Sequence, residues 1–212
     1  MIFNKHSDLV GQHAFLGASK FYWLNYDDDV LLARYQQQYA TNIGTVLHKL
    51  ASDCIKNNIR LSKSADKHLI ALELIRNDIP TDYVNIATIL DTLVPFVNDA
   101  IGFKMISEQI LYYSENCFGT ADAISFRNNM LRIHDYKSGS IPAHMEQLLI
   151  YAALFCLEYK INPRDIEVEL RIYQNGEILY HRPEPDEIID ITKKIANADN
   201  LITKFTSKEV AL

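Results

Sequence analysis

Residues 118–137, FGTADAISFRNNMLRIHDYK, decide the fold, because they predict two short strands joined by a tight turn. Alternate residues share a face in 118–126, and the same period of two returns in 131–137. Between them, the Asn128-Asn129 pair suits a turn that needs positive φ angles. The stretch therefore predicts a β-hairpin.

Three charged side chains of this hairpin are expected to converge. Because side chains alternate across a strand, Asp135 and Lys137 project to one face while Tyr136 points away. Asp122 lies toward the middle of the first strand, so pairing of the strands brings its carboxylate beside that of Asp135. The alternative is a solvated hairpin with a chance Asp-x-Lys, which Ile133, on the same face as Asp135, disfavours.

Paired carboxylates of this kind favour a metal site. They repel each other unless a divalent cation neutralises them. Hard oxygen ligands suit Mg²⁺ or Mn²⁺, which keep several waters for a substrate phosphate. Lys137 would then help to activate an attacking water or stabilise charge on phosphate oxygens.

The composition is that of an ordinary globular protein, with 212 residues, 48% hydrophobic and 23% charged. We expect no membrane partner and a cytoplasmic location, because no run approaches a membrane span and MIFNKHSDLV lacks a signal-peptide core. Three widely spaced cysteines, Cys54, Cys117 and Cys156, argue against a disulfide framework.

The net charge is acidic, with a formal value of -6 and a pI near 5.6. Such a chain does not coat nucleic acid non-specifically. A nuclease is not excluded, because a local basic groove can coexist with an acidic remainder.

The order of predicted elements indicates an α/β fold with a central mixed sheet of four or five strands, flanked by helices. Helices are expected at 43–57, 64–79, 81–101, 142–160 and 183–205, and further strands at 105–113 and in a 165–182 hairpin around Asn175-Gly176. We expect Pro95 to kink or end its helix. We interpret 1–212 as a single domain, with a mainly helical part at 1–104, the sheet core at 105–182, and a C-terminal helix and tail at 183–212.

The N-terminal region is rich in aromatic residues and is followed by three aspartates. Phe21, Tyr22 and Trp23 are expected to be buried core rather than a surface that stacks on nucleic acid. The aspartates at 27–29 are expected to form a solvated turn or a helix cap.

Three segments in order, GTADAI at 119–124, LRIHDYKSG at 131–139 and EQLLIYA at 146–152, resemble the core of the PD-(D/E)XK nuclease superfamily, in its RecB-like and phage-exonuclease branch. The resemblance extends from Gly44 to the strand near Arg171, and it implies a restriction-endonuclease-like core. Ala121 stands where the superfamily's name has Pro, a common substitution in this branch.

The resemblance also implies a metal-ligand set. His48 lies on the 43–57 helix, where a lone histidine is usually structural. The family, however, has a Gly-x-x-x-His helix whose imidazole reaches the metal, and Gly44 to His48 matches that spacing. Together with His48, the implied ligands are Asp122, Asp135 and the backbone carbonyl of Tyr136.

Other site residues follow from the same resemblance. Glu108, in the 105–113 strand, lies either at the solvent edge or toward the site, where the family uses a glutamate to support the metal. Gln147 and Tyr151 are four residues apart, hence on one helix face. They are either ordinary helix residues or the family's Gln-x-x-x-Tyr motif, which contacts the active site or the DNA backbone. Ser19 belongs to an N-terminal segment that in the family packs beside the site.

The implied function is a divalent-metal-dependent DNA nuclease, most simply an exonuclease in recombination, repair or phage DNA processing. Two alternatives stay open: a catalytically silent nucleic-acid-binding or assembly module, and a structure-specific endonuclease. The implied partners are DNA and a recombination or single-strand-annealing protein, and a homo-oligomeric ring would explain processivity. Some relatives hold an iron-sulfur cluster with cysteines near the end of the chain, but because no cysteine follows Cys156 we expect none here.

Overall fold

The structure is a computed structural model that describes residues 7, 14–79, 81, 84–139 and 141–209. Its internal contacts divide the chain into two compact units, Met1–Asn42 and Ile43–Leu212. The second unit contains the whole of the expected sheet core. Within the described residues, none of the helices combines the length and the apolar character needed to cross a membrane.

The elements follow one another in an order close to the expected one. They are η2 Ala18–Asn25, α1 Asp28–Lys56, α2 Lys67–Arg76, α3 Ile86–Gly102, β1 Ile106–Ser114, β2 Cys117–Arg127, β3 Met130–Lys137, α4 Glu146–Tyr159, η4 Pro163–Asp165, β4 Glu167–Gln174, β5 Glu177–His181 and α5 Pro185–Glu209.

The strands form one mixed sheet of five, in the order β1-β2-β3-β4-β5. β3 and β4 are parallel, with α4 between them in the chain, and the other neighbouring pairs are antiparallel. The two turns with asparagine contain the expected positive φ angles, 52° and 58° at Asn128 and Asn129 and 53° and 78° at Asn175 and Gly176. The α/β fold is therefore confirmed, with five strands.

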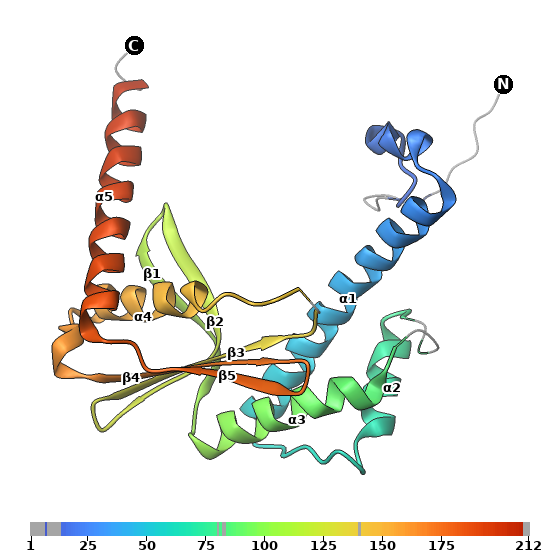
Figure 1. Ribbon diagram of the computed structural model, residues 1–212, viewed down its shortest axis with the longest axis horizontal. Helices are drawn as coiled ribbons and strands as arrows, with labels where there is room; N and C mark the ends of the chain where they lie inside the picture. The colour runs from blue at the N-terminus through green and yellow to red at the C-terminus, as the bar shows by residue number, and fades with distance from the viewer. Residues whose placement is uncertain (1–6, 8–13, 80, 82–83, 140, 210–212) are drawn as a thin grey trace. The chain divides into compact units, whose positions relative to one another are not determined.

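Helices cover both faces of the sheet, with α3 and α4 on opposite sides (Figure 1). On the α4 side, Leu131 and Ile133 of β3 belong to the same buried apolar cluster as Leu148. On the α3 side, the ring of Tyr136 lies 5.6 Å from that of Phe96. Alternation along β3 thus supplies one core layer on each face.

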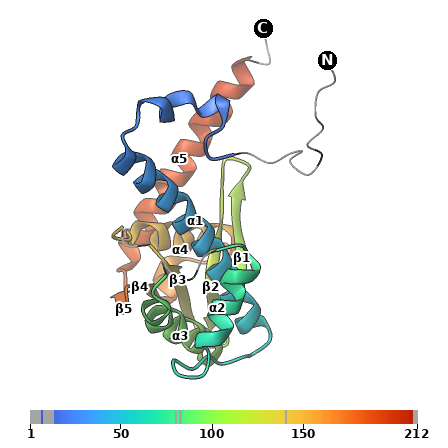
Figure 2. The ribbon, with the colours of Figure 1, turned by 90° about the vertical axis from the view of Figure 1, so that its right-hand side faces the viewer.

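The β1–β2 hairpin bends toward the side of the sheet that carries α4 and α5 (Figure 1 and Figure 2). Polar contacts tie its far part to these helices. The backbone N–H of Tyr112 donates to Glu158 of α4 at 2.8 Å, and the hydroxyl of Ser114 donates to Asp199 of α5 at 2.6 Å. The bend therefore wraps the outer strands around α4.

The predicted alternation across 118–126 is broken at this bend. Gly119 and Ala121 face α4 before Asp122, and Ile124 faces α4 after it. An unbroken period of two would have put Ile124 on the opposite face from Ala121. Asp122, at this interruption, is therefore only partly buried and does not belong to the apolar cluster that contains Ala121 and Ile124.

Several helix boundaries differ from the expected ones. α1 begins at Asp28 instead of residue 43, because the Asp27 carboxylate caps it by accepting the backbone N–H of Val30 at 2.8 Å. α3 begins at Ile86 instead of residue 81, after a similar cap from Asn85. α3 also runs through Pro95, so this proline does not end it.

The N-terminal aromatic residues do not form the expected buried core. In η2, Phe21 is 54% exposed and Tyr22 is 63% exposed, and their rings stack on each other at 4.4 Å between centroids. No residue of η2 is buried. The run therefore packs against itself within the described residues of its own unit.

Glu169 of β4 is the centre of a buried charge cluster. Its carboxylate is buried and lies 3.3 Å from Arg132 Nε, 3.0 Å from Arg171 Nη2 and 3.5 Å from Arg182 Nη2. The rings of Phe103 and Tyr180 lie beside these guanidinium groups. Glu169 thus balances several cations where β3, β4 and β5 pair, and Asp99 lies 3.1 Å from Arg171 Nη1 as a second counter-charge.

We predict that Glu169→Ala lowers the free energy of unfolding by about 3–5 kcal/mol, because it leaves the partly buried guanidinium of Arg132 without its counter-charge and that of Arg171 with Asp99 alone. Urea unfolding measures the change. Glu167→Ala, at the exposed first residue of β4, is the control and should change stability by less than about 0.5 kcal/mol. Equal effects of the two substitutions would contradict this account of the cluster.

Candidate metal centre

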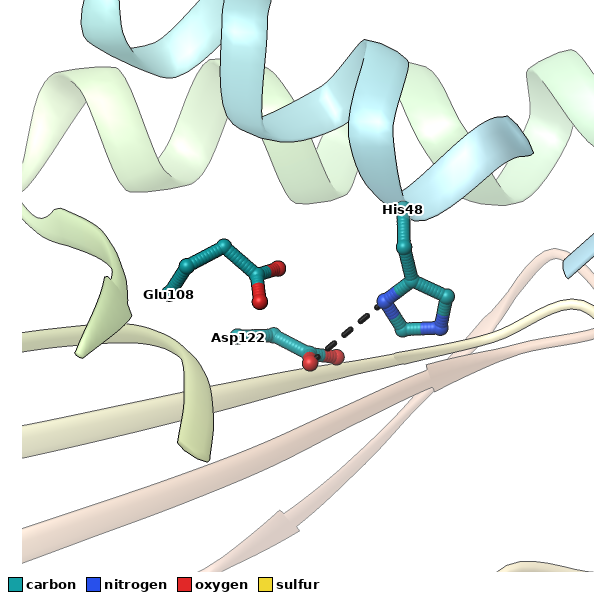
Figure 3. Close-up of side chains that lie close together, drawn as sticks. All are labelled: His48, Glu108 and Asp122. Atoms are coloured by element: carbon teal, nitrogen blue, oxygen red, sulfur yellow. Dashed lines mark ion pairs between the residues drawn. The ribbon is translucent and has the colours of Figure 1, made fainter. Parts of the chain in front are cut away.

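Three side chains from three elements converge beside the bend in the sheet. His48 comes from α1, Glu108 from β1 and Asp122 from β2, and one ligand atom of each lies within 4.8 Å of those of the other two. Figure 3 shows the two carboxylates and the imidazole pointing toward one another. Among the described residues, this is the group of histidine and acidic side chains with metal-ligand spacing.

His48 reaches the site because α1 passes close to the loop after β3. A Cβ atom on Gly44 would lie only 3.0 Å from the hydroxyl of Ser138, so the absence of a side chain there permits this approach. His48 follows four residues later, on the same helix face. Its ring also packs edge-on against Tyr136, with centroids 5.3 Å apart.

The Asp122 side chain accepts a backbone hydrogen bond at the point where β2 and β3 separate. The pairing of these strands ends at Ala123 and His134. Just beyond, the backbone N–H of Tyr136 donates to Asp122 Oδ2 at 2.8 Å. The other oxygen, Oδ1, lies 3.4 Å from His48 Nδ1. The carboxylate is therefore fixed by one oxygen and faces the site with the other.

Glu108 has an unusual backbone conformation. Its φ angle of 54° falls inside β1, whereas four of the eight other positive φ angles among the described residues belong to asparagine. A glutamate rarely adopts this conformation, and such strain concentrates at functional sites. The conformation places the carboxylate of Glu108 with Asp122 and His48.

A second polar group lies on the α4 side of β3. Lys137 Nζ donates to Asp135 Oδ1 at 3.2 Å and to Gln147 Oε1 at 3.0 Å. Gln147 Nε2 lies within hydrogen-bond distance of Asp135 Oδ1, at 3.3 Å, and of Tyr151 Oη, at 3.2 Å. These four residues form one connected hydrogen-bond network.

Gly119 makes room for this network. A Cβ atom there would lie 2.9 Å from Cε1 of Tyr151, closer than side chains normally approach. The bare backbone of β2 therefore lets the Tyr151 ring lie against it, with its hydroxyl next to Gln147.

The acidic groups are destabilised in their charged forms. Burial, followed by the negative charge of Asp122, raises the pKa of Asp135 to about 6, although Lys137 and His48 oppose this shift. Burial and Asp122 also raise the pKa of Glu108. For His48, burial lowers the pKa, but the contact with Asp122 and the nearby carboxylates outweigh it and leave the pKa raised.

These observations fit a divalent cation. Asp135 Oδ2 is buried and accepts no hydrogen bond, although Lys137 Nζ lies 2.9 Å away. The carboxylates of Glu108 and Asp122 repel each other, and Asp122 also repels Asp135. Carboxylate oxygens with one imidazole suit Mg²⁺ or Mn²⁺. A cation here would offset the burial and the repulsion that raise the pKa values of Asp135 and Glu108.

The structure arranges the expected ligands in a different way from the sequence interpretation. Glu108, expected in a supporting role, lies within the group of three with His48 and Asp122. Asp135, expected as a ligand, lies outside that group and contacts Lys137. The backbone N–H of Tyr136 binds Asp122, and metal binding by its carbonyl stays a prediction.

Ser19 lies in η2, within the first unit, and its side chain is exposed. The other expected site residues all belong to the second unit. The role of Ser19 beside the site therefore stays a prediction. The three cysteines are free thiols, as the sequence indicated.

Gln174, at the end of β4, is a supporting residue that the sequence analysis missed. Its amide nitrogen donates to the carbonyls of Gly139 and Ile141, both at 2.7 Å, and its oxygen accepts from the backbone N–H of Ala143 at 3.1 Å. These hydrogen bonds fix the loop between β3 and α4 to the end of β4. α4 begins at Glu146 instead of residue 142. The sequence signal for this residue was its position: Gln174 follows Leu170 and Ile172 at alternate positions of β4, so a buried polar side chain could have been expected there.

Comparison with known protein families identifies one that matches most of the chain. The profile of DUF2800, described as "Protein of unknown function (DUF2800)", matches residues 13–176, which contain all the residues of the candidate metal centre. No curated protein and no solved structure matches the chain.

We predict that Asp135→Asn stabilises the metal-free protein at pH 7 by about 1–3 kcal/mol. Because the pKa of Asp135 is raised from 3.8 to about 6 on folding, the folded chain binds its proton more tightly than the unfolded chain does. The stability of the wild type is therefore lost as the pH rises from about 4 through 6, and the variant escapes this loss.

Urea unfolding in EDTA, repeated between pH 4 and pH 7, measures the difference. Asp190→Asn, at an exposed position on α5, is the control and should show no such pH-dependent gain. A variant that is no more stable than the wild type at pH 7 would contradict the strained charge of Asp135.

Proposed function

The chain belongs to DUF2800, a family of unknown function, and we propose that it is a divalent-metal-dependent DNA nuclease that hydrolyses phosphodiester bonds. The observation that carries the proposal is the convergence of His48, Glu108 and Asp122 next to the Asp135–Lys137 pair. A structural role alone would not require Asp122 to lie beside two other acids that it repels.

The residues divide into two functions. His48, Glu108 and Asp122 would hold the cation, and Asp135 would join them through Oδ2, the oxygen that accepts no hydrogen bond. When bound, Mg²⁺ or Mn²⁺ supplies Lewis-acid stabilisation of the negative charge on the phosphoryl group. The acids themselves bind no phosphate, so substrate binding depends on this neutralisation.

Lys137 would position the attacking water and the phosphate. An ammonium group has three N–H donors, and the hydrogen bonds to Asp135 and Gln147 use two of them. The third donor is available to a water or to a phosphate oxygen. The Lys137 side chain is 30% exposed, so substrate can reach it while its two partners fix its direction.

The network on α4 orients the lysine. Gln147 bridges Lys137, Asp135 and Tyr151, so a change in its side chain alters all three contacts. Tyr151 lies at the outer end of this chain of hydrogen bonds, where its hydroxyl would contact the sugar–phosphate backbone. This matches the role that the resemblance gives to the pair.

The subtype rests on the resemblance to the RecB-like and phage-exonuclease branch. On that basis we propose an exonuclease of recombination, repair or phage DNA processing, which acts with a recombination or single-strand-annealing protein. A catalytically silent assembly module would not need the intact set of acids and lysine.

We predict Mg²⁺- or Mn²⁺-dependent loss of end-labelled linear DNA, with closed circular DNA left intact. Asp122→Asn should abolish digestion because it removes a metal ligand. Lys137→Gln should slow digestion by about 10²–10³-fold, because it removes a donor to the reacting group. Gel electrophoresis of timed digests, with EDTA as the blank, measures these rates.

Glu115→Gln is the matched control, because Glu115 is exposed in the turn between β1 and β2, outside the candidate centre. It should digest DNA at the wild-type rate. Cutting of closed circles would replace the exonuclease with an endonuclease, and intact DNA under every metal condition would contradict the nuclease proposal.

A further inference from the structure

A polar cavity lies at the opposite end of the β2–β3 hairpin from the candidate metal centre. Its volume is about 570 Å³. It is formed where the end of α3 meets the turn between β2 and β3, and its lining residues are Gly102, Phe103, Lys104, Arg127, Asn128, Met130 and Arg132. Three of these side chains are cationic and none is acidic, in a chain whose net charge is -6.

Two of the three cations are not neutralised by the protein. Lys104 and Arg127 are both exposed, and neither forms an ion pair with any described acidic side chain. The exposed Glu167, opposite Met130 in the sheet, offsets only part of this charge. The local excess of positive charge is therefore available to an anionic ligand.

The third cation belongs to an ordered array. The guanidinium carbon of Arg132 lies 4.6 Å from the centre of the Phe103 ring, and that of Arg171 lies 5.0 Å from it. The Glu169 carboxylate forms ion pairs with both arginines. Because these contacts fix the guanidinium of Arg132 in advance, little side-chain entropy remains to be lost when it binds an anion.

The cavity and the metal centre share one face of the sheet. Arg132 and Tyr136 alternate onto the same face of β3, and the ring of Tyr136 contacts His48. Asp122 and Arg127 both lie in β2, five residues apart, so a strand rise of about 3.3 Å per residue separates the two positions by up to roughly 17 Å. Phosphates of one DNA strand advance about 3.4 Å each along a duplex, so about five of them span this distance.

We infer that this cavity binds the sugar–phosphate backbone of nucleic acid, several nucleotides away from the phosphate at the metal centre. The inference rests on the proposed function for its choice of ligand, because a second phosphate site on the same face serves a polymer that continues past the first. Lys104 and Arg127 supply charges that no described acidic side chain neutralises. Arg132 supplies a fixed guanidinium whose N–H groups can donate hydrogen bonds to phosphate oxygens.

Fluorescence anisotropy with a labelled blunt-ended duplex in EDTA tests the inference without cleavage. The double variant Lys104→Gln/Arg127→Gln should lower the slope of log affinity against log salt by about two, one for each lost phosphate contact. Lys194→Gln/Lys204→Gln removes the same charge from exposed positions on α5 and should leave the slope unchanged.

The outcomes separate this inference from the proposed function. If the Lys104/Arg127 variant keeps the wild-type slope and digests DNA normally, the cavity inference is wrong and the nuclease stands. If the variant loses DNA binding in a protein that digests nothing, the inference holds and the nuclease fails. Absence of DNA binding by the wild type, or equal binding of polyglutamate at this site, would overturn the inference in favour of no ligand or an acidic protein.

Discussion

The hydrogen bond from the Tyr136 backbone N–H to Asp122 is the interaction on which the site depends. Where β2 leaves β3, a buried N–H group would lose its partner at a cost of about 1–3 kcal/mol. The Asp122 carboxylate satisfies that N–H with one oxygen. The strands can therefore separate without penalty, which opens space for Glu108 and His48 and leaves the other oxygen facing them. One side chain thus serves the fold and the candidate chemistry together.

Much of the sheet could be predicted because its signals are local. The Asn128-Asn129 and Asn175-Gly176 turns need positive φ angles that these residues tolerate, and both turns form as expected. Helix ends were predicted less well, because side chains distant in sequence determine them. The start of α4 depends on Gln174, which holds the preceding loop from another strand. Such a contact leaves no local pattern.

The sequence predicted which residues belong to the candidate site better than it predicted how they are arranged. Asp135 and Lys137 pair because alternation puts them on one face, which the sequence alone indicates. The β1–β2 register, with Ser107 opposite Ala123 and Gln109 opposite Ala121, places Glu108 across from Asp122. The φ angle of 54° at Glu108, by contrast, is specified by no strand pattern. The arginine array around Glu169 was missed for a related reason, since alternating charged residues in a strand ordinarily indicate a solvated face.

Titration calorimetry with Mn²⁺ on the metal-free protein tests most directly whether His48, Glu108 and Asp122 form a metal site. The account predicts heat from saturable Mn²⁺ binding to the wild type and to Glu115→Gln, and its loss in Asp122→Asn. Because the readout is binding alone, it does not depend on having found the correct substrate. Mn²⁺ binding of equal affinity in Asp122→Asn and the wild type would contradict the account.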